Sequence, residues 1–247
     1  MNKITVFLCD DHTIFRQGLR LLLKTSEDIE VIGEAQNGQC GVREALRLRP
    51  NVVVMDIAMP LLNGLEASRQ ITRQAPDVKV LILSSYSDEQ YVQHAIAAGA
   101  SGYVMKQTTS DDILRAIRET SKGDAYFSPA IAMSLVKQWR TRDAGSNTTS
   151  AAALTTRETE VLQLIAEGHC NKQIAGVLLV SMKTVEYHRQ TLMNKLDIHK
   201  TAILTRYAVG AGIVESRRYS PLDSRIGPPA AQPVGIKKRK KTEHEIL

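Results

Sequence analysis

The sequence predicts an α/β protein in which a five-stranded, doubly wound parallel sheet is tethered to a small all-α domain of four helices. In the first half of the chain, apolar β-branched runs alternate five times with helical patterns. This alternation calls for parallel strands with helices on both faces of the sheet. In the second half, four short helical patterns follow one another with no strand between them, which predicts helices alone.

The strands of the first half are expected near residues 4–9, 30–34, 52–55, 78–84 and 102–105, and the helices near 14–24, 38–49, 64–74, 89–98 and 110–122. The third strand is apolar throughout and ends in Asp56, with Pro60 shortly after it. A continuous apolar run of this kind is typical of a strand buried on both faces. No Gly-rich phosphate loop follows any strand, so we expect no nucleotide site.

Charge divides the chain into two halves. Residues 1–124 contain 14 Lys and Arg against 16 Asp and Glu, whereas residues 125–247 contain 18 against 10. An acidic half before a basic half indicates two domains with different partners, and nucleic acid is a candidate partner for the second.

Membrane and disulfide chemistry are not expected. No apolar run is long enough to cross a bilayer and no signal segment is visible, so we expect no membrane contact and a cytoplasmic location. Cys9, Cys40 and Cys170 form no C-x-x-C pair. They suit a reducing compartment and predict neither a disulfide framework nor a zinc site.

Reactive side chains follow the strands at their carboxyl ends, namely Asp10, Asp11, Asp56, Ser84 and Lys106. These ends converge on one edge of a doubly wound sheet, where ligands bind. Crowded carboxylates raise one another's pKa unless a cation lies among them, and oxygen ligands suit Mg²⁺. A lysine and a hydroxyl would bind phosphoryl oxygens. The set predicts a carboxylate that accepts a phosphoryl group.

Four motifs carry this set: Asp10-Asp11-His12; Met55-Asp56-Ile57-Ala58-Met59-Pro60 with Asn63-Gly64; Leu83-Ser84; and Gly102-Tyr103-Val104-Met105-Lys106. Together they make residues 1–122 resemble the receiver domain of a bacterial two-component response regulator, which implies a flavodoxin-like fold. The resemblance implies that a sensor histidine kinase phosphorylates Asp56. It also implies the Mg²⁺ ligands, which are Asp10, Asp11, Asp56 and the backbone carbonyl of Ala58. Ser84 and Tyr103 match the switch pair, and Lys106 the phosphoryl contact.

Other interpretations of these residues stay open. A lone Asp at a strand end more often caps a turn than performs chemistry. Ser85 competes with Ser84 as the switch hydroxyl. Packing alone would also explain Tyr103, because half-buried strand positions favour tyrosine.

The chain beyond the predicted sheet divides into three parts. Residues 125–153 read as a linker that contains a short helix near 130–140 and a small, polar tether from 141. Residues 154–214 form the expected helical domain. Residues 215–247 form a polar tail with a basic run at 237–241, which we expect to be disordered and either solvated or non-specifically attracted to DNA.

The helical domain has the pattern of a helix-turn-helix. Thr155 and Glu158 have capping-box spacing, and Asn171 and Ser181 are expected to cap the second and third helices, with a fourth near 200–210. In the third helix the apolar stripe is Val185, His188, Leu192 and Leu196, and the opposite face carries Lys183, Glu186, Tyr187, Gln190 and Asn194. Such a polar face suits insertion into the major groove, although a solvated surface would look alike.

Three further motifs are Leu154-Thr155-Thr156-Arg157-Glu158, Asn171-Lys172-Gln173-Ile174-Ala175, and Lys183-Thr184-Val185-Glu186-Tyr187-His188. They resemble the LuxR-type helix-turn-helix, and a receiver followed by this module is typical of the NarL/FixJ-type response regulators. The resemblance implies promoter DNA and RNA polymerase as partners. The expected DNA-binding residues are Lys172, Lys183, Thr184, Glu186, Tyr187, His188, Arg189, Gln190 and Lys195.

We expect two roles within this set. Lys172, Lys183, Arg189 and Lys195 would contact phosphates, and Glu186, Tyr187 and Gln190 would face the bases. Residues 154–214 contain 7 Lys and Arg against only 5 Asp and Glu, so one copy should bind weakly and a homodimer on DNA is expected.

The sequence therefore predicts a transcription factor that phosphorylation of Asp56 controls, with Mg²⁺ as cofactor. The first alternative is a regulator that binds DNA regardless of phosphorylation and uses its receiver only for docking or dimerisation. The second is a Mg²⁺-dependent aspartyl-phosphate phosphatase. Such an enzyme needs a second carboxylate two positions after the nucleophile, and Ala58 stands there, so we expect no turnover enzyme.

Overall fold

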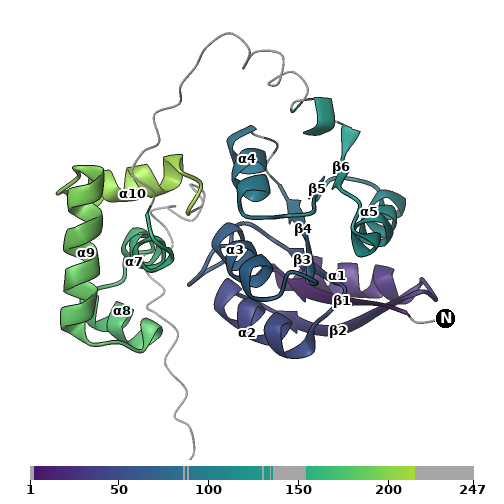
Figure 1. Cartoon of the computed structure of the whole chain (residues 1–247), viewed down its shortest axis with the longest axis horizontal. Coiled ribbons are helices and arrows are strands. Elements are labelled where there is room, and N and C mark those ends of the chain that lie inside the picture. The colour runs from purple at the N-terminus through teal and green to yellow at the C-terminus, as the bar shows by residue number, and fades with distance from the viewer. Residues whose placement is uncertain are drawn as a thin grey trace, which may run out of the picture. The chain divides into compact units, whose positions relative to one another are not determined.

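A computed structural model describes residues 3–85, 87, 89–129, 131–133, 135 and 154–214. Residues up to 129 fold into a parallel sheet covered by helices, and residues 154–214 fold into helices alone (Figure 1). Most of the predicted linker helix, the tether at 141–153 and the basic tail lie outside the described residues.

The sheet has the order β2-β1-β3-β4-β5-β6, and every pair of neighbours is parallel. Its strands are β1 (Ile4–Cys9), β2 (Ile29–Ala35), β3 (Val52–Met55), β4 (Lys79–Ser84), β5 (Gly102–Met105) and β6 (Tyr126–Phe127). The parallel α/β class is confirmed. All four residues of β3 are buried, because the strand lies inside the sheet with helices over both faces.

The prediction of five strands is wrong, because β6 adds a sixth at the edge of the sheet. The chain leaves the preceding helix through Gly123, whose φ of 94° is left-handed. It then runs beside β5, where the backbone N–H of Tyr126 donates to Ser101 at 3.2 Å and that of Ser128 to Tyr103 at 3.2 Å. Two residues are too few to show a strand periodicity, so the pattern alone could not predict this element.

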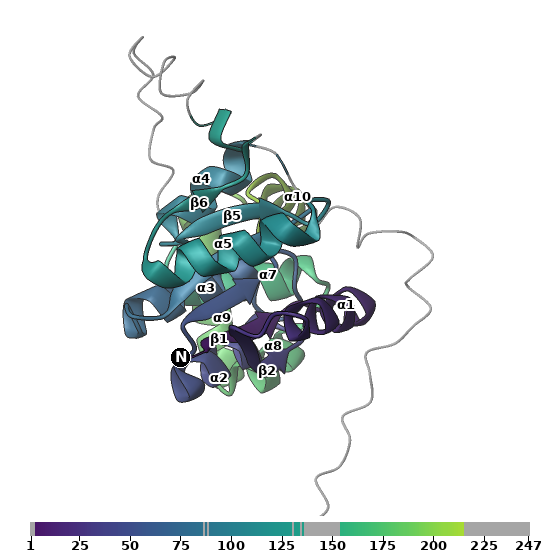
Figure 2. The same cartoon turned by 90° about the vertical axis from the view of Figure 1, so that its right-hand side faces the viewer.

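The helices α1 to α5 cover the two faces of the sheet (Figures 1 and 2). One face packs against α1 (Thr13–Lys24) and α5 (Ser110–Lys122), and the other against α2 (Gly38–Leu48), α3 (Gly64–Gln74) and α4 (Glu89–Ala97). Each face has its own apolar core. Because parallel strands alternate their side chains between two covered faces, both sets are apolar.

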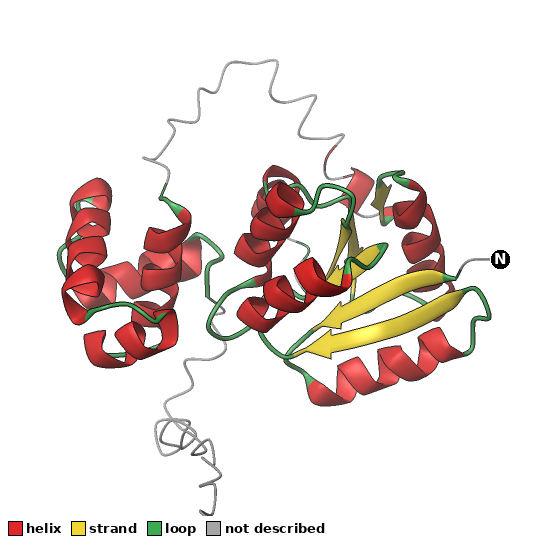
Figure 3. Ribbon diagram, turned by 60° about the horizontal axis from the view of Figure 1, so that its bottom comes forward, coloured by secondary structure: helices red, strands yellow, loops and turns green. Residues whose placement is uncertain are grey.

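Residues 154–214 contain α7 (Thr156–Ala166), α8 (Asn171–Leu178), α9 (Met182–Leu196) and α10 (Thr201–Gly210). In Figure 3 they are the group of red helices that has no yellow strand. They share one apolar core, in which Val185 and Leu192 of α9 are fully buried. His188 and Leu196, which the sequence placed in the same stripe, are only half-buried.

The helix starts agree with the predicted caps at two of three positions. Thr155 and Glu158 form a capping box at α7, and Ser181 caps α9 through its side chain. The expected cap at Asn171 is wrong, because Cys170 is the N-cap of α8 and Asn171 is its first helical residue. Among the described helices none has the length and apolar character that crossing a membrane would need.

Candidate functional site

The carboxyl ends of β1 and β3 bring Asp10 and Asp56 together. The two strands pair in register up to Cys9 and Met55, and the N–H of Asp56 donates to the carbonyl of Cys9 at 2.8 Å. The next residue of each strand therefore emerges at the same level. Asp10 is 5% exposed and Asp56 is 4% exposed, so two carboxylates lie close together and nearly out of water.

Lys106 provides the counter-charge. It follows β5, whose register with β4 places Met105 opposite Ser84. Its Nζ lies 2.7 Å from Asp10 Oδ2 and 2.9 Å from Asp56 Oδ2, and 4.7 Å from the centroid of the Phe15 ring. The structure thus joins three of the predicted site residues directly. A compact ammonium held in this way is well placed to neutralise an added phosphoryl oxygen.

His12 belongs to the same cluster, although we did not predict a role for it. Its Nδ1 lies 3.1 Å from Asp11 Oδ1, 3.3 Å from Asp10 Oδ1 and 3.7 Å from Asp56 Oδ2. The imidazole is well exposed, so it forms the outer rim of the pocket. Its position directly after the acidic pair was the available signal.

Arg16 supports the pocket beneath Asp10, and the sequence did not predict this role either. This buried guanidinium donates from Nη1 to the carbonyl of Asp10 at 2.6 Å and from Nε to Glu34 Oε2 at 3.0 Å. Glu34 also accepts from Arg20 Nη1 at 2.9 Å. Arg16 lies one turn into α1 after His12, so it holds the end of β1 against β2. No motif in the sequence predicts that these charged residues support the pocket.

Burial raises the pKa of Asp56 to about 6, and the neighbouring charges of Asp10 and Asp11 add to the rise, whereas Lys106 opposes it. Burial alone would lower the pKa of Lys106, but the charges of Asp56 and Asp10 raise it overall. The ammonium therefore stays protonated, and it compensates only part of the cost of burying the carboxylates.

The donors in this pocket fit a hard divalent cation. Ligand atoms of Asp10, Asp11, His12 and Asp56 all lie within 4.8 Å of one another. Burial is the main cause of the raised pKa of Asp56, the charges of Asp10 and Asp11 add to it, and a cation would favour the ionised carboxylate. Carboxylate oxygens are the ligands that Mg²⁺ prefers.

The predicted switch residues are both buried. Ser84 ends β4 and Tyr103 lies in β5, and neither side chain is exposed. Ser85, the competing choice for the hydroxyl, is exposed. The backbone links Ser84 to the acidic pocket, because the N–H of Lys106 donates to the carbonyl of Ser84 at 2.8 Å.

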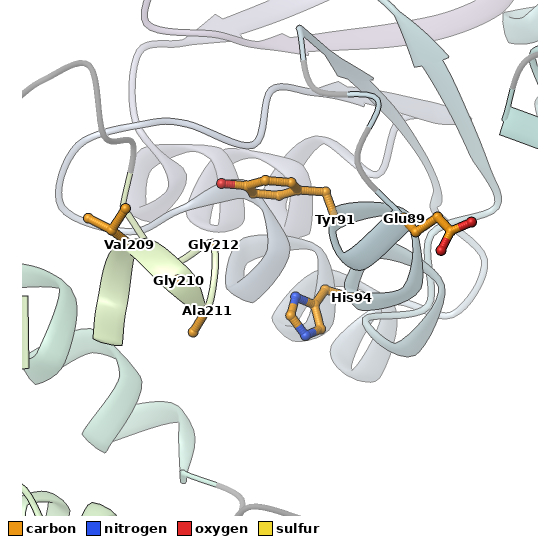
Figure 4. Close-up of a pocket in the computed structure, with 7 residues that line it drawn as sticks. All are labelled: Glu89, Tyr91, His94, Val209, Gly210, Ala211 and Gly212. Atoms are coloured by element: carbon orange, nitrogen blue, oxygen red, sulfur yellow. The ribbon is translucent and has the colours of Figure 1, made fainter. Parts of the chain in front are cut away.

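A second pocket includes Tyr91 and His94 of α4 (Figure 4). Its side chains differ in chemistry from those of the acidic pocket. Among the described residues of its lining, Glu89 is the acidic side chain, and none is a lysine or arginine. Burial lowers the pKa of His94, and the charge of Arg69 adds to the effect, so the imidazole is neutral near pH 7.

The solvent face of α9 matches the predicted face. Lys183, Glu186, Tyr187, Gln190 and Asn194 are all exposed. Lys172 at the start of α8 is exposed too, whereas Thr184 and His188 are half-buried. The side chain of Gln190 donates from Nε2 to Asn194 Oδ1 at 3.0 Å, which orients the amide.

Two of the predicted phosphate-binding cations have partners within the helical domain. Arg189 donates to Asn171 Oδ1 at 3.1 Å and to Thr201 Oγ1 at 2.8 Å. Lys195 Nζ lies 2.7 Å from Oε2 of the buried Glu158, the residue that completes the capping box. Each group has further N–H donors beyond these contacts, so it could contact a phosphate while it keeps these partners.

Lys195→Ala is expected to lower the free energy of unfolding of the helical domain by about 1 kcal/mol, because it leaves Glu158 buried without its ion-pair partner. Burial raises the pKa of Glu158, but the bonds from Lys195 and Thr155 lower it overall. The contribution is therefore present above the ordinary glutamate pKa and lost as the pH falls through the folded value. Hydrogen exchange of α7 amides measures it, with Lys183→Ala as the matched control. Equal effects of the two variants would contradict the prediction.

Comparison with protein families identifies both parts of the chain. Residues 6–118 match the response regulator receiver domain, and residues 152–208 match the bacterial regulatory proteins of the luxR family. The acidic pocket lies in the first match and α8 and α9 in the second.

Relatives match across both domains. The transcriptional regulatory protein LiaR of Bacillus subtilis is 40% identical over 205 residues, which cover 83% of this chain and 96% of the relative. The oxygen regulatory protein NreC of Staphylococcus carnosus is 36% identical over 208 residues, covering 83% and 96%.

Solved structures of response regulators are similar to this chain as well. A LuxR-family response regulator from Aurantimonas has a TM-score of 0.54 at 30% identity, covering 56% of this chain and 99% of its own. Two RcsB dimers bound to two parallel DNAs give a TM-score of 0.52 at 25% identity, covering 85% and 99%. On the combined evidence of pocket, helices and relatives, the chain belongs to the NarL/FixJ-type response regulators, transcription factors with a receiver domain and a LuxR-type DNA-binding domain.

Proposed function

We propose that Asp56 accepts a phosphoryl group from a sensor histidine kinase, and that this modification controls the binding of promoter DNA by residues 154–214. The observation that carries the proposal is the pair of buried carboxylates with Lys106 Nζ between them, at 2.7 Å from Asp10 and 2.9 Å from Asp56. An ion pair that served only the fold would not need a second buried carboxylate, which destabilises the fold.

The geometry distinguishes the two oxygens of Asp56. The N–H of Ile57 donates to Oδ1 at 2.8 Å and so orients the carboxylate. Oδ2, which faces Lys106, is the proposed nucleophile. It attacks the phosphorus of a phosphohistidine, the P–N bond breaks, and the departing imidazole nitrogen keeps the electron pair. Lys106 then contacts a phosphoryl oxygen, and Ser84 and Tyr103 respond as the switch pair.

The same residues would hold Mg²⁺, with Asp10, Asp11, Asp56 and the carbonyl of Ala58 as ligands. When bound, the ion neutralises charge on the transferring phosphoryl group. Ala58 brings no second carboxylate, so the residues on this edge leave the phosphoryl group in place instead of promoting its hydrolysis. This favours a switch over a turnover phosphatase.

DNA binding is proposed for the four helices α7–α10 acting as one helix-turn-helix module. Lys172 and Lys183 would contact phosphates. The residues that would face bases are Glu186, Tyr187 and Gln190. The remaining predicted residues would lie at the edge of the interface, namely Thr184, His188, Arg189 and Lys195, of which the first three are half-buried. A homodimer on a two-part site follows from the weak net charge of each copy. RNA polymerase is a further expected partner.

The proposal is tested by DNA selection from a random library with the full chain, with and without a small phosphodonor and Mg²⁺. Affinity for the selected sites should rise with phosphodonor for the wild type and should not respond for Asp56→Asn. Asp77→Asn, an exposed aspartate of the same domain, is the matched control and should behave as wild type. If phosphodonor leaves wild-type affinity unchanged, the regulator that binds DNA regardless of phosphorylation is the better description.

Two variants of α9 should separate positioning from readout. Lys183→Ala is expected to weaken binding to all sequences and to reduce the dependence of affinity on salt, because a phosphate contact is lost. Gln190→Ala should cost about 1–3 kcal/mol at preferred sites only, because a base contact is lost. Titrations against several sequences at two salt concentrations measure both. Identical behaviour of the two variants would contradict these assignments.

A further inference from the structure

Two apolar side chains lie on the solvent face of α9 without a role in polar readout. Met182 is 47% exposed and Tyr187 is 68% exposed. Met182 is four residues before Glu186 and eight before Gln190, so the three share one side of the helix. When nucleic acid covers this face, the Met182 side chain and the carbon atoms of the Tyr187 ring need an apolar partner, because only the Tyr187 hydroxyl forms strong hydrogen bonds.

The polar residues between them indicate which base pair is read. The bond from Gln190 Nε2 to Asn194 Oδ1 leaves one amide N–H and the amide oxygen of Gln190 for a base edge. One donor beside one acceptor matches N7 and the N6 amino group of adenine. An adenine brings a paired thymine, whose C5 methyl group is the apolar feature of the major groove.

One aromatic contact partly restrains the exposed ring of Tyr187. Its ring meets the ring of His188 edge-on, with centroids 5.6 Å apart and an interplanar angle of 67°. A ring restrained in this way loses less conformational freedom on binding. Glu186 lies on the same face, where it can accept from a base amino group but would repel a phosphate. Its placement favours the groove floor over the backbone.

We propose that α9 reads an A·T-containing half-site in which Met182 and the ring of Tyr187 contact thymine methyl groups beside the adenine recognised by Gln190. This proposal rests on the proposed DNA-binding function. It assigns the specificity to a chemical group, the C5 methyl, which can be removed from DNA without altering any hydrogen bond.

The test replaces thymine by uracil. The full chain, treated with phosphodonor and Mg²⁺, selects a preferred duplex, and its affinity is then compared with that for the same duplex carrying dU at every dT position. Each contacted methyl that is lost should weaken wild-type binding about fourfold, the value expected for one buried methylene-sized group. Met182→Ala should bind the dT duplex more weakly and show a smaller dT-to-dU ratio than wild type.

Met133→Ala is the matched control, because Met133 is 74% exposed and lies outside residues 154–214. Its dT-to-dU ratio should equal that of wild type. If Met182→Ala does not fold, as judged by circular dichroism, Tyr187→Ala provides the same comparison.

The outcomes separate this proposal from the one it rests on. Equal wild-type affinity for the dT and dU duplexes overturns the methyl contacts, and so does a selected site without A·T pairs, while DNA binding itself stands. Failure of the phosphodonor-treated chain to bind any DNA overturns the proposed function together with this one. A reduced ratio in Met182→Ala but not in Met133→Ala supports the proposal.

Discussion

Asp56→Asn is expected to abolish phosphoryl uptake and, in metal-free buffer at pH 8, to raise the free energy of unfolding by about 1–2 kcal/mol. An amide oxygen cannot replace the carboxylate nucleophile, so the first effect should be complete. The second effect arises because the substitution removes a charge that burial destabilises and that lies beside the charges of Asp10 and Asp11. Loss of function and gain of stability are thus expected from the same atom.

The pH dependence of the gain follows from the sign of the pKa shift. The pKa of Asp56 rises from 3.8 to about 6 on folding. The folded chain therefore holds the proton more tightly than the unfolded chain, so the contribution of Asp56 to stability is full below pH 3.8 and is lost as the pH rises through 6. The advantage of Asp56→Asn should accordingly be small near pH 4 and reach its full value above pH 7.

Urea unfolding followed by hydrogen exchange of amides in β1 and β3 measures this stability at several pH values. Asp77→Asn, which changes an exposed carboxylate, should leave both stability and uptake unchanged. Mg²⁺ should stabilise wild type more than Asp56→Asn, because a ligand that binds only the folded state raises its stability. A variant that is less stable than wild type at pH 8 would show that burial of Asp56 is better compensated than its pKa indicates.

Gly64→Ala is expected to lower the free energy of unfolding of the receiver domain by about 2–4 kcal/mol. A Cβ atom on Gly64 would lie 1.8 Å from the backbone oxygen of Asp56 and 3.0 Å from Cγ of Met55. The backbone is already close there, since the N–H of Gly64 donates to the carbonyl of Ile57 at 2.8 Å. The loop after β3 would have to shift, and phosphoryl uptake should fall with stability.

Gly176→Ala is the same substitution with the opposite expected sign. Gly176 lies inside α8, and a Cβ atom there would meet no atom within 4 Å. Because alanine restricts the unfolded chain and favours the helix, stability should rise by about 0.5–1 kcal/mol. Thermal unfolding of both variants compares them directly. A stable Gly64→Ala chain with normal uptake would mean that the loop adapts at little cost.

The sequence predicted well the elements in which the pattern of apolar residues repeats over several positions. Five strands and five helices of the receiver domain lie within a residue or two of their expected bounds, and residues 154–214 are helical as predicted. Long elements average over many positions, so one unusual residue does not hide the pattern. β6 was missed because two residues carry no period, and Asn171 was mistaken for a cap because Cys170 is an uncommon one.

The acidic pocket was predictable in its members but not in its support. Asp10, Asp56 and Lys106 each follow a predicted strand, so topology alone brings them to one edge. Arg16 and Glu34 come from α1 and β2, and their contact with the carbonyl of Asp10 depends on how the helix packs on the sheet. No local pattern encodes that packing, since a surface arginine and a buried one look alike in sequence.

The pattern of neighbouring residues therefore determined the fold class, the edge of the sheet that carries the acidic pocket and the polar face of α9. Only the tertiary structure decided which neighbours each charged group has. In the folded chain Lys106 forms ion pairs with two carboxylates and Lys195 with Glu158. Arg189 donates hydrogen bonds to Asn171 and Thr201. The physical reason is range: periodicity is a property of neighbouring residues, whereas a counter-charge comes from a distant segment that packing alone brings near.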